Sequence, residues 1–153
     1  MKQKKKSKNK PILIDLFCGC GGLSYGFSKA GFKTILGADN WEVSLKTFKK
    51  SHPGSETESV DILHTSPEKI AKKYKIKNVD VIVGGPPCQG FSISGKRIVD
   101  DPRNKLYKAF LRFVFYFKPS AFVMENVPLF KRNRECAGKK FQIEPGRVSA
   151  NDP

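Results

Sequence analysis

The stretch VDVIVGGPPCQGFS, residues 79–92, decides the fold of this chain. Its first half, Val79 to Val83, is a short apolar run of the kind that forms a buried β-strand. Two glycines and two prolines then end the strand, because proline cannot continue a hydrogen-bonded ladder. Cys88 follows at the carboxyl end of the strand, where open α/β sheets bind their ligands. The position predicts a functional thiol, although an isolated free cysteine is more commonly a buried small apolar residue.

Other apolar runs alternate with helical patterns on both sides of this stretch. Further strands are predicted at residues 11–17, 31–39, 59–62 and 120–124, and helices at 27–30, 43–50, 68–74 and 106–117. Residues 51–58 are polar and are predicted to be a loop. Strands that alternate with helices are typical of a doubly wound α/β sheet. We expect a mixed sheet that ends after its fifth strand.

The composition indicates one basic domain. The 153 residues include 29 Lys and Arg against 14 Asp and Glu, a formal net charge of +15. Six lysines lie within residues 1–10, which we expect to be a disordered basic arm, and +9 remains without them. Such a charge favours a polyanionic partner, most simply nucleic acid.

The same composition bears on compartment and metals. No apolar run approaches the ~18–20 residues needed to cross a bilayer, and no apolar segment of a signal peptide follows the lysines. The four cysteines have neither the spacing of a disulfide framework nor that of a zinc site. We therefore expect a cytoplasmic protein, nucleoid-associated if the source is bacterial, with no membrane contact and no metal.

A glycine-rich turn, CGCGGLSYG at residues 18–26, follows the first predicted strand. A strand, such a turn and a helix form the nucleotide-binding opening of a doubly wound sheet, although the turn can also serve only to pack helix on strand. Ser24 stands where a dinucleotide fingerprint has its third glycine, which argues against nicotinamide or flavin. Asp39 lies where a ribose-binding carboxylate is expected, or it caps the helix at 43–50. Trp41, the only tryptophan, either flanks a base or packs in the core.

Two further segments complete the expected site. The polar, basic residues 92–103 suit phosphate contacts or form an ordinary solvated loop. Glu125 and Asn126 follow the strand at 120–124, which we expect to lie beside the strand that leads to Cys88. A carboxylate and an amide would then stand next to the thiol.

With DLF at 15–17, PPCQ at 86–89 and ENV at 125–127, the chain resembles DNA (cytosine-5) methyltransferases over about residues 12–128. The resemblance implies an S-adenosylmethionine-dependent methyltransferase fold, a Rossmann-like α/β sheet, and S-adenosyl-L-methionine as cofactor. The residues that it implies as cofactor contacts are Phe17, Gly19, Gly21, Leu23, Asp39, Asn40, Trp41, Asp61, Ile62, Pro87 and Leu106.

The resemblance also assigns roles within that set. Asp39 would take the ribose hydroxyls, Asp61 and Ile62 the adenine edge, and Pro87 and Leu106 the methionine end. Family members often carry a bulky residue where this chain has Asn40, and Trp41 is expected to replace it.

The implied reaction explains the catalytic pair. The thiolate of Cys88 would add to C6 of cytosine and make C5 nucleophilic, while Glu125 would protonate or hydrogen-bond N3. The target cytosine cannot be reached inside double-stranded DNA, so it would be flipped out, and the loop at 92–97 would close over it.

The motifs that follow ENV in the family, a Gln-x-Arg-x-Arg strand, a target-recognition region and a late asparagine motif, do not occur in this sequence. We expect residues 11–130 to form the amino-terminal half of a catalytic domain whose sheet is incomplete at its carboxyl end, and 131–153 to be an irregular basic tail. The chain would be truncated, or would be one subunit of a split enzyme with a complementing carboxyl-terminal subunit. The alternatives are an RNA or tRNA cytosine-5 methyltransferase and an inactive nucleic-acid-binding fragment.

Overall fold

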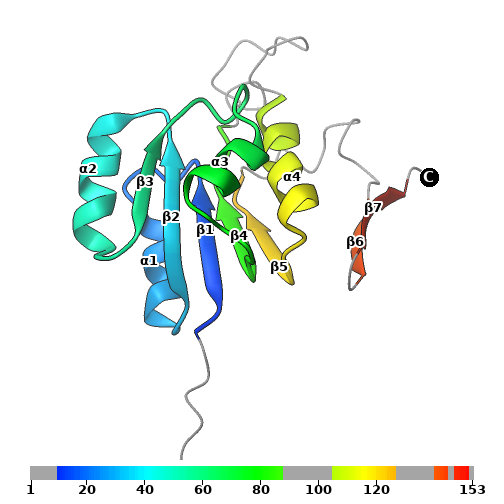
Figure 1. Ribbon diagram of the computed structural model, residues 1–153, viewed down its shortest axis with the longest axis horizontal. Coiled ribbons are helices and arrows are strands. Elements are labelled where there is room, and N and C mark those ends of the chain that lie inside the picture. The colour runs from blue at the N-terminus through cyan, green and yellow to red at the C-terminus, as the bar shows by residue number, and fades with distance from the viewer. Residues whose placement is uncertain (1–9, 88–104, 127–139, 145–146, 152–153) are drawn as a thin grey trace, which may run out of the picture.

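The computed structural model describes residues 10–87, 105–126, 140–144 and 147–151 (Figure 1). The elements in chain order are β1 (Ile12–Leu16), α1 (Gly22–Lys29), β2 (Lys33–Asp39), α2 (Glu42–Ser51), β3 (Glu56–Ser59), α3 (Pro67–Lys73), β4 (Val81–Gly84), α4 (Leu106–Phe117), β5 (Ala121–Met124), β6 (Lys140–Glu144) and β7 (Arg147–Asn151). Among the described residues, no helix has the length and apolar character needed to cross a bilayer.

Five strands form one sheet in the order β3-β2-β1-β4-β5, and every neighbouring pair is parallel. The predicted α/β fold is confirmed, whereas the expectation of a mixed sheet is wrong for the described strands. A parallel pair needs a crossover connection, and the described helices supply these connections. The strand order reverses between β1 and β4, which is the switch point where such sheets open a crevice for ligands.

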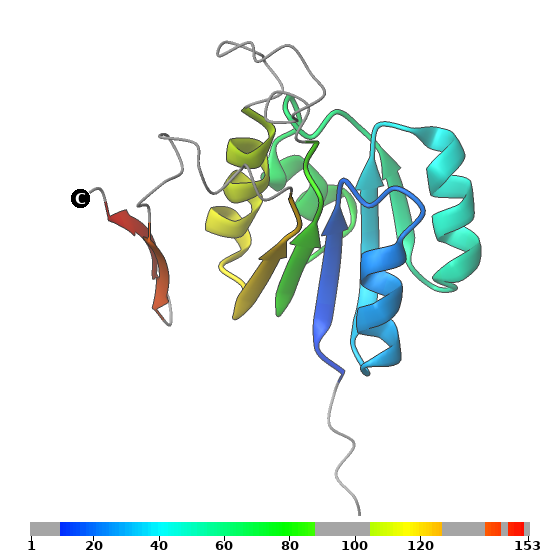
Figure 2. The same cartoon turned by 180° about the vertical axis from the view of Figure 1, so that it is seen from behind.

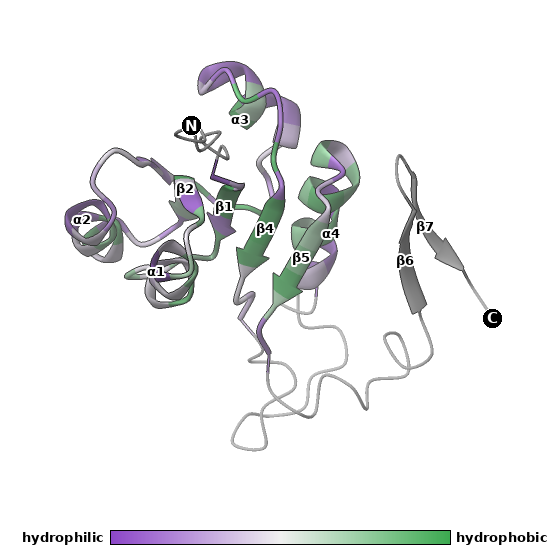
Figure 3. Ribbon diagram, turned by 90° about the horizontal axis from the view of Figure 1, so that it is seen from below, coloured by the Kyte–Doolittle hydropathy of each residue, from purple (hydrophilic) through white to green (hydrophobic). Residues whose placement is uncertain are grey.

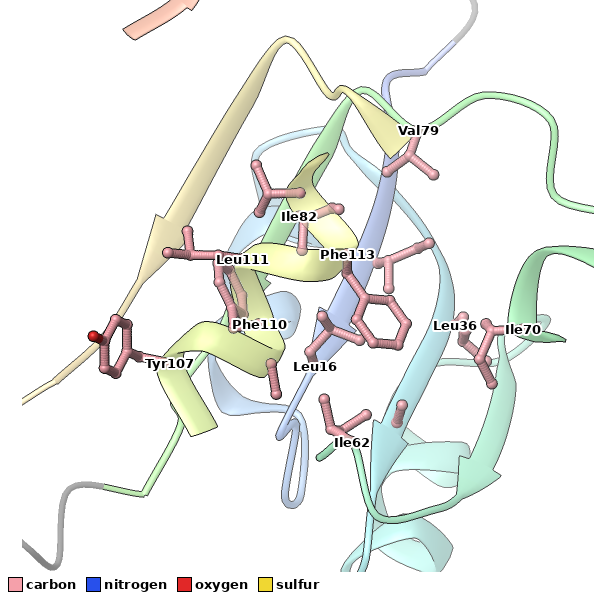
Figure 4. Packing of buried hydrophobic residues seen from close by; sticks show 14 residues of the cluster. Leu16, Leu36, Ile62, Ile70, Val79, Ile82, Tyr107, Phe110, Leu111 and Phe113 are labelled. Carbon is pink, nitrogen blue, oxygen red and sulfur yellow. The ribbon is translucent and has the colours of Figure 1, made fainter. Parts of the chain in front are cut away.

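Helices cover both faces of the sheet (Figures 1 and 3). On one face, α3 and α4 pack over the main core, where Phe110 and Phe113 are fully buried against strand residues such as Leu16 and Ile82 (Figure 4). On the other face, α1 packs over β1 and β4, whose Leu13, Val81 and Val83 contact Phe27 and Phe32. Both faces of the central strands are buried, which explains their continuous apolar sequences.

The observed boundaries follow the predicted ones with two main differences. The predicted helix at residues 106–117 coincides with α4, but α1 begins at Gly22, earlier than predicted. The strand β3 lies mostly within the segment predicted as a loop, and it shares only Ser59 with the strand predicted at 59–62. Its sequence, ETES, has no apolar period because β3 is an edge strand with exposed and half-buried side chains.

The segment expected to be an irregular tail contains two strands. β6 and β7 pair antiparallel, with Glu144 opposite Arg147 as the innermost pair. The two residues between them in sequence are Pro145 and Gly146, a dipeptide that favours turns. The predicted arm, residues 1–10, lies outside the described residues except for Lys10.

Candidate active site

The carboxyl ends of the five parallel strands bring the candidate residues to one edge of the sheet. Phe17 follows β1, Asp39 ends β2, and residues 60–62 follow β3. Residues 85–87 follow β4, and Glu125 follows β5. Segments that are far apart in the sequence therefore meet because parallel strands all point their carboxyl ends the same way.

A cavity of about 130 Å³ opens at this edge. It is lined by Phe17, Asp39, Asn40, Val60, Asp61, Ile62, Gly85, Pro87 and Leu106. Most of the predicted cofactor residues are thus brought together by the structure, whereas Gly19, Gly21, Leu23 and Trp41 do not line this cavity. Sequence reasoning missed two residues that line the cavity, Val60 and Gly85. Val60 directly precedes Asp61, and Gly85 directly precedes the motif PPCQ.

The glycine turn between β1 and α1 is a left-handed backbone segment. Phe17, Gly19 and Gly21 have φ values of 55°, 51° and 86°. Glycine adopts such values without steric cost, whereas at Phe17 they are uncommon and indicate local strain. Backbone hydrogen bonds from Gly21 N to Cys18 O (2.8 Å) and from Cys18 N to Ala38 O (3.2 Å) hold the turn over the end of β2.

Gly19 and Gly21 are needed for different reasons. A Cβ atom at Gly21 would lie 2.6 Å from both His52 Cε1 and Phe48 Cδ2, so this glycine lets the turn pack against α2. A Cβ atom at Gly19 would meet no atom within 4 Å, so the space beside that residue is open. The packing role therefore applies to Gly21, and the open side of the turn at Gly19 remains accessible to a ligand.

Leu23 and Trp41 lie at the surface. Their exposed fractions are 36% and 61%, so the core-packing alternative for Trp41 is wrong. Trp41, and not Asp39, is the N-cap residue of α2, which also excludes the capping role considered for Asp39.

The two acids of the cavity form similar local turns. Asp39 Oδ1 accepts a hydrogen bond from Trp41 N (2.9 Å), and Asp61 Oδ1 accepts one from Leu63 N (2.8 Å). Asp39 has a second bond, because its Oδ2 accepts the N–H of Gly19 at 2.8 Å. Such side-chain turns fix the direction in which the chain leaves each strand.

The structure describes the segments on both sides of Cys88, up to residue 87 and from residue 105 onward. Cys88 itself lies outside the described residues, as does the loop at 92–103. Glu125 N donates to Gly84 O at 2.9 Å, so Glu125 starts beside the end of β4. A Cβ atom at Gly85 would lie 3.1 Å from Glu125 Oε2, so glycine at this position lets the carboxylate lie against the turn. Asn126 Nδ2 donates to Pro86 O at 3.2 Å and ties the two strand ends together.

A buried carboxyl group that sequence reasoning missed lies behind the glycine turn. Asp15 in β1 is 1% exposed, and its Oδ2 has no hydrogen-bond partner among the described residues. Burial raises the pKa of Asp15 to about 7, although its interactions with Ser24 oppose the shift. The sequence signal is an acid inside an otherwise apolar strand.

Of the two cysteines near the turn, Cys18 differs from a reactive thiol. Burial raises the pKa of Cys18 far above its ordinary range, and the charges of Asp15 and Asp39 raise it further. A thiol in such surroundings is a poor nucleophile. Cys20 is exposed, and the described residues contain no cluster of three or more His, Cys, Asp or Glu residues that could hold a metal ion.

Comparison with known proteins identifies the family. The model of the C-5 cytosine-specific DNA methylase family matches residues 12–143. The chain belongs to this family. The predicted resemblance is thereby confirmed, and the matched range extends past the residues from which it was inferred.

Several type II methyltransferases are similar to this chain in sequence. The type II methyltransferase M.DdeI of Desulfomicrobium norvegicum is 46% identical over 115 residues, which cover 75% of this chain and 27% of M.DdeI. M.HgiGI of Herpetosiphon aurantiacus is 37% identical over 116 residues, which cover 74% of this chain and 88% of that relative. The chain thus spans about a quarter of the length of some relatives and most of the length of another.

Solved structures agree with the family assignment. A proposed DNA modification methyltransferase encoded within an E. coli prophage has a TM-score of 0.72 and 36% identity, covering 84% of this chain and 35% of that one. A Spodoptera frugiperda DNMT2 variant has a TM-score of 0.60 and 26% identity, covering 82% of this chain and 38% of that one. The parallel sheet and its helices therefore form the Rossmann-like methyltransferase fold, as predicted.

Proposed function

We propose that this chain is part of an enzyme that transfers a methyl group from S-adenosyl-L-methionine to C5 of cytosine in DNA. The observation that carries the proposal is the meeting, at one sheet edge, of the acid-lined cavity and of Glu125 beside the turn that leads to Cys88. Membership of the C-5 cytosine-specific DNA methylase family supports the choice of substrate.

The chemistry of the cavity fits the cofactor. Asp39 and Asp61 offer carboxylates, Asn40 an amide, and residues such as Phe17 and Ile62 an apolar surface. The cofactor is a cationic molecule with an aromatic base, and neighbouring carboxylates would favour its charge. The volume of about 130 Å³ is below the ~300 Å³ of typical small-molecule pockets, so the cavity would hold one part of it. The open side of Gly19 gives the remainder a place at the glycine turn.

Two side chains would act on the cytosine. The thiolate of Cys88 forms a bond to C6, and the electron pair of the C5–C6 double bond becomes available at C5. Glu125 hydrogen-bonds or protonates N3 and so neutralises the charge that develops on the ring. S-adenosyl-L-methionine, when bound, would supply an electrophilic methyl group to C5 and would leave as the neutral thioether S-adenosyl-L-homocysteine. Loss of the C5 proton to solvent and expulsion of the Cys88 thiolate would then restore the aromatic ring.

The surroundings of Glu125 support this assignment. Gly85 leaves room for the carboxylate, and Asn126 bonds the backbone of Pro86, so the two catalytic segments have a fixed relation at their bases. A functional group held by such contacts loses little entropy when it reacts. Because the reacting atoms of cytosine are stacked inside duplex DNA, the proposal requires that the base is flipped out.

The remaining partners follow from charge and length. The formal charge of +15 would attract the phosphate backbone without regard to base sequence. The chain matches about a quarter of M.DdeI, so we propose that target recognition depends on residues equivalent to the unmatched part, in the same polypeptide or in a complementing carboxyl-terminal subunit.

Substitution of Cys88 tests the covalent step. The chain, alone and combined with the carboxyl-terminal part of M.DdeI, is incubated with S-adenosyl-L-methionine and duplex DNA that carries 5-fluorocytosine. Fluorine cannot leave as a proton does, so the cysteine remains bound to C6, and a denaturation-resistant adduct is expected with the combined polypeptides. Cys88→Ser should abolish the adduct, whereas Cys136→Ser should retain it.

Glu125→Gln should slow methyl transfer by roughly 10²–10⁴-fold.

The outcomes separate the candidate functions. An adduct that survives Cys88→Ser would place the nucleophile elsewhere, with Cys18 and Cys20 to be tested next. Methyl transfer to tRNA but not to duplex DNA would favour an RNA cytosine-5 methyltransferase. Nucleic-acid binding without any transfer or adduct would favour an inactive binding fragment.

A further inference from the structure

Arg112 of α4 bonds two consecutive backbone carbonyls in the loop between β3 and α3. Its Nη2 donates to Ile62 O at 2.8 Å and to Leu63 O at 2.7 Å. The two acceptors lie 50 and 49 residues before Arg112 in the sequence. Hydrogen bonds from a guanidinium group are charge-assisted and stronger than those between neutral groups. Arg112 therefore links α4 to a loop that is distant from it in the sequence.

The loop forms a turn whose own bonds do not use these two carbonyls. Asp61 O accepts the N–H of His64 at 3.1 Å, and Asp61 Oδ1 accepts the N–H of Leu63 at 2.8 Å. Ile62 and Leu63 are the central residues of this turn, and the carbonyls of central residues take no part in the bond that closes it. A backbone carbonyl in a buried place needs a donor, and Ile62 is only 1% exposed. Arg112 supplies that donor.

This loop forms part of the cavity wall. Val60, Asp61 and Ile62 line the cavity, and α4 adds its first residue, Leu106. The side chain of Ile62 is fixed by packing, because it belongs to the same buried cluster as residues of α4 (Figure 4). The side chain of Asp61 is 52% exposed, so packing does little to fix it. The position of the Asp61 carboxylate therefore depends on the loop backbone, which Arg112 holds.

We propose that Arg112 is a positioning residue for the base of the cofactor: it holds the loop so that the carboxylate of Asp61 meets the adenine edge. Arg112 itself does not line the cavity, so it acts through the loop and not by contact with the ligand. This inference rests on the proposed function, because it concerns how the same cavity selects S-adenosyl-L-methionine. Its consequence is that loss of the guanidinium group reduces the preference for adenine over another base.

The test compares two ligands that differ in the base. Wild type, Arg112→Met, Arg112→Lys and Lys108→Met are titrated with S-adenosyl-L-homocysteine and with S-inosyl-L-homocysteine by ligand-observed NMR, which detects weak binding. The inosyl ligand has a carbonyl oxygen where adenine has its amine, and the carboxylate of Asp61 can accept a hydrogen bond from the amine but not from that oxygen. The wild type should therefore prefer the adenosyl ligand by about tenfold.

The variants separate positioning from charge. Arg112→Met should reduce the preference to about twofold, because the loop then holds Asp61 less firmly. Arg112→Lys keeps the charge but not the planar fork of donors, so its preference should lie between those of wild type and Arg112→Met. This variant also carries the test if Arg112→Met does not fold. Lys108→Met, the matched control, removes a positive charge one turn earlier on α4 and should keep the preference of the wild type.

A second measurement needs no ligand. The amide hydrogen of Leu63 is protected by Asp61 Oδ1, so it should exchange with solvent about tenfold faster in Arg112→Met than in the wild type. The amide hydrogen of Asp80 is the control within the same molecule. It bonds Ile12 O at 2.9 Å, outside the loop, and its exchange should not change.

Four results would overturn the inference. If Arg112→Met weakens both ligands by the same factor and keeps the preference, Arg112 serves only general stability. Equal acceleration of exchange at Leu63 and Asp80 would lead to the same conclusion. If the wild type binds both ligands equally well, Asp61 does not read the base, although cofactor binding itself stands. If the wild type binds neither ligand at millimolar concentration, the cofactor part of the proposed function fails, and this inference fails with it whatever the exchange rates show.

Discussion

At the scale of single residues, the most unusual group is Asp15. A carboxyl group inside a parallel sheet is rare because an ion in such surroundings loses its hydration. Here the side chain is 1% exposed, and Ser24 lies beside it as the polar neighbour that lowers its pKa. The Ser24 hydroxyl in turn lies 3.2 Å from His52 Nε2, so a buried polar network underlies the glycine turn. Asp15 in the folded chain is therefore mostly protonated below about pH 7.

This protonation predicts an unusual pH dependence of stability. The pKa of Asp15 rises from its ordinary value of 3.8 to about 7 on folding, so the folded chain keeps a proton that the unfolded chain has lost. The contribution of Asp15 to the free energy of unfolding should therefore be fully present below pH 3.8 and be lost as pH rises through about 7, so the free energy of unfolding should fall by roughly 3 kcal/mol between pH 5 and pH 8. Urea denaturation at several pH values measures the slope.

Asp15→Asn should remove this slope and give a more stable protein than the wild type at pH 8, because no charge is then buried. Ser24→Ala, which keeps the carboxyl group, should keep the slope. Burial alone would raise the pKa of Glu58, but Lys73 and Tyr74 outweigh it and lower this pKa below its ordinary value of 4.5. The stability that Glu58 contributes therefore changes with pH only below about 4.5, outside the range from pH 5 to pH 8. A slope that persists in Asp15→Asn would contradict the assignment to Asp15.

At the scale of elements, the docking of α2 on the sheet depends on two glycines. Phe48 of α2 is fully buried, and its ring stacks on His52 with centroids 4.2 Å apart. A Cβ atom at Gly37 of β2 would lie 2.4 Å from Phe48 Cζ, and one at Gly21 would lie 2.6 Å from Phe48 Cδ2. The aromatic ring thus occupies the space that two side chains would need, and it sets how closely α2 and the glycine turn approach β2.

Substitution of Gly37 tests this packing without altering the backbone, because Gly37 does not have a positive φ. Gly37→Ala should lower the free energy of unfolding by about 1–3 kcal/mol through overpacking. Combined with Phe48→Leu, the same substitution should cost less than it does in the wild type. Denaturant titration of the four proteins in this double-mutant cycle measures the coupling.

Gly26→Ala is the matched control. Gly26 lies within α1, and a Cβ atom there would meet nothing within 4 Å. This substitution should stabilise the chain by about 0.5–1 kcal/mol, since alanine favours a helix more than glycine does. Equal effects of the two glycine substitutions would show that Phe48 does not restrict the space at Gly37.

At the scale of the whole molecule, the sheet has one side that the described elements leave open. β5 pairs only with β4 among the described strands, and Val123 on it is 40% exposed. Figure 2 shows that α1 covers β1 and β2, while the same face of β5 has no helix over it. Figure 3 shows that β4 and β5 are hydrophobic strands. An apolar edge strand of this kind favours association with another chain.

The isolated chain should therefore self-associate through β5. Val123→Lys should weaken this association about tenfold, equivalent to roughly 1.4 kcal/mol, because a lysine on an edge strand opposes pairing. Analytical ultracentrifugation over a concentration series measures the change. Val43→Lys serves as the control, since Val43 is 59% exposed on α2, away from β5. If both variants dissociate equally, general charge repulsion and not the β5 edge controls association.

The sequence by itself determined the family, the α/β class and the strand ends at which the site lies. Those features depend on local sequence. An apolar run followed by glycines and prolines predicts the end of a strand, and α4 shows a helical apolar period over its whole length. The motifs around Cys88 and Glu125 were recognisable because each occupies consecutive positions.

Only the tertiary structure decided which of these residues touch one another. The polar strand β3 forms because a neighbouring strand supplies its hydrogen bonds, which no local pattern records. Gly21 and Gly37 are required by a ring on α2, and Asp39 is engaged by an amide 20 residues earlier. Asp15 has a raised pKa because the packing of the folded chain excludes water from it. Contacts between distant segments depend on how the elements pack. The apolar period of one element predicts its type and its buried face, but it does not show which residues of another element it will contact.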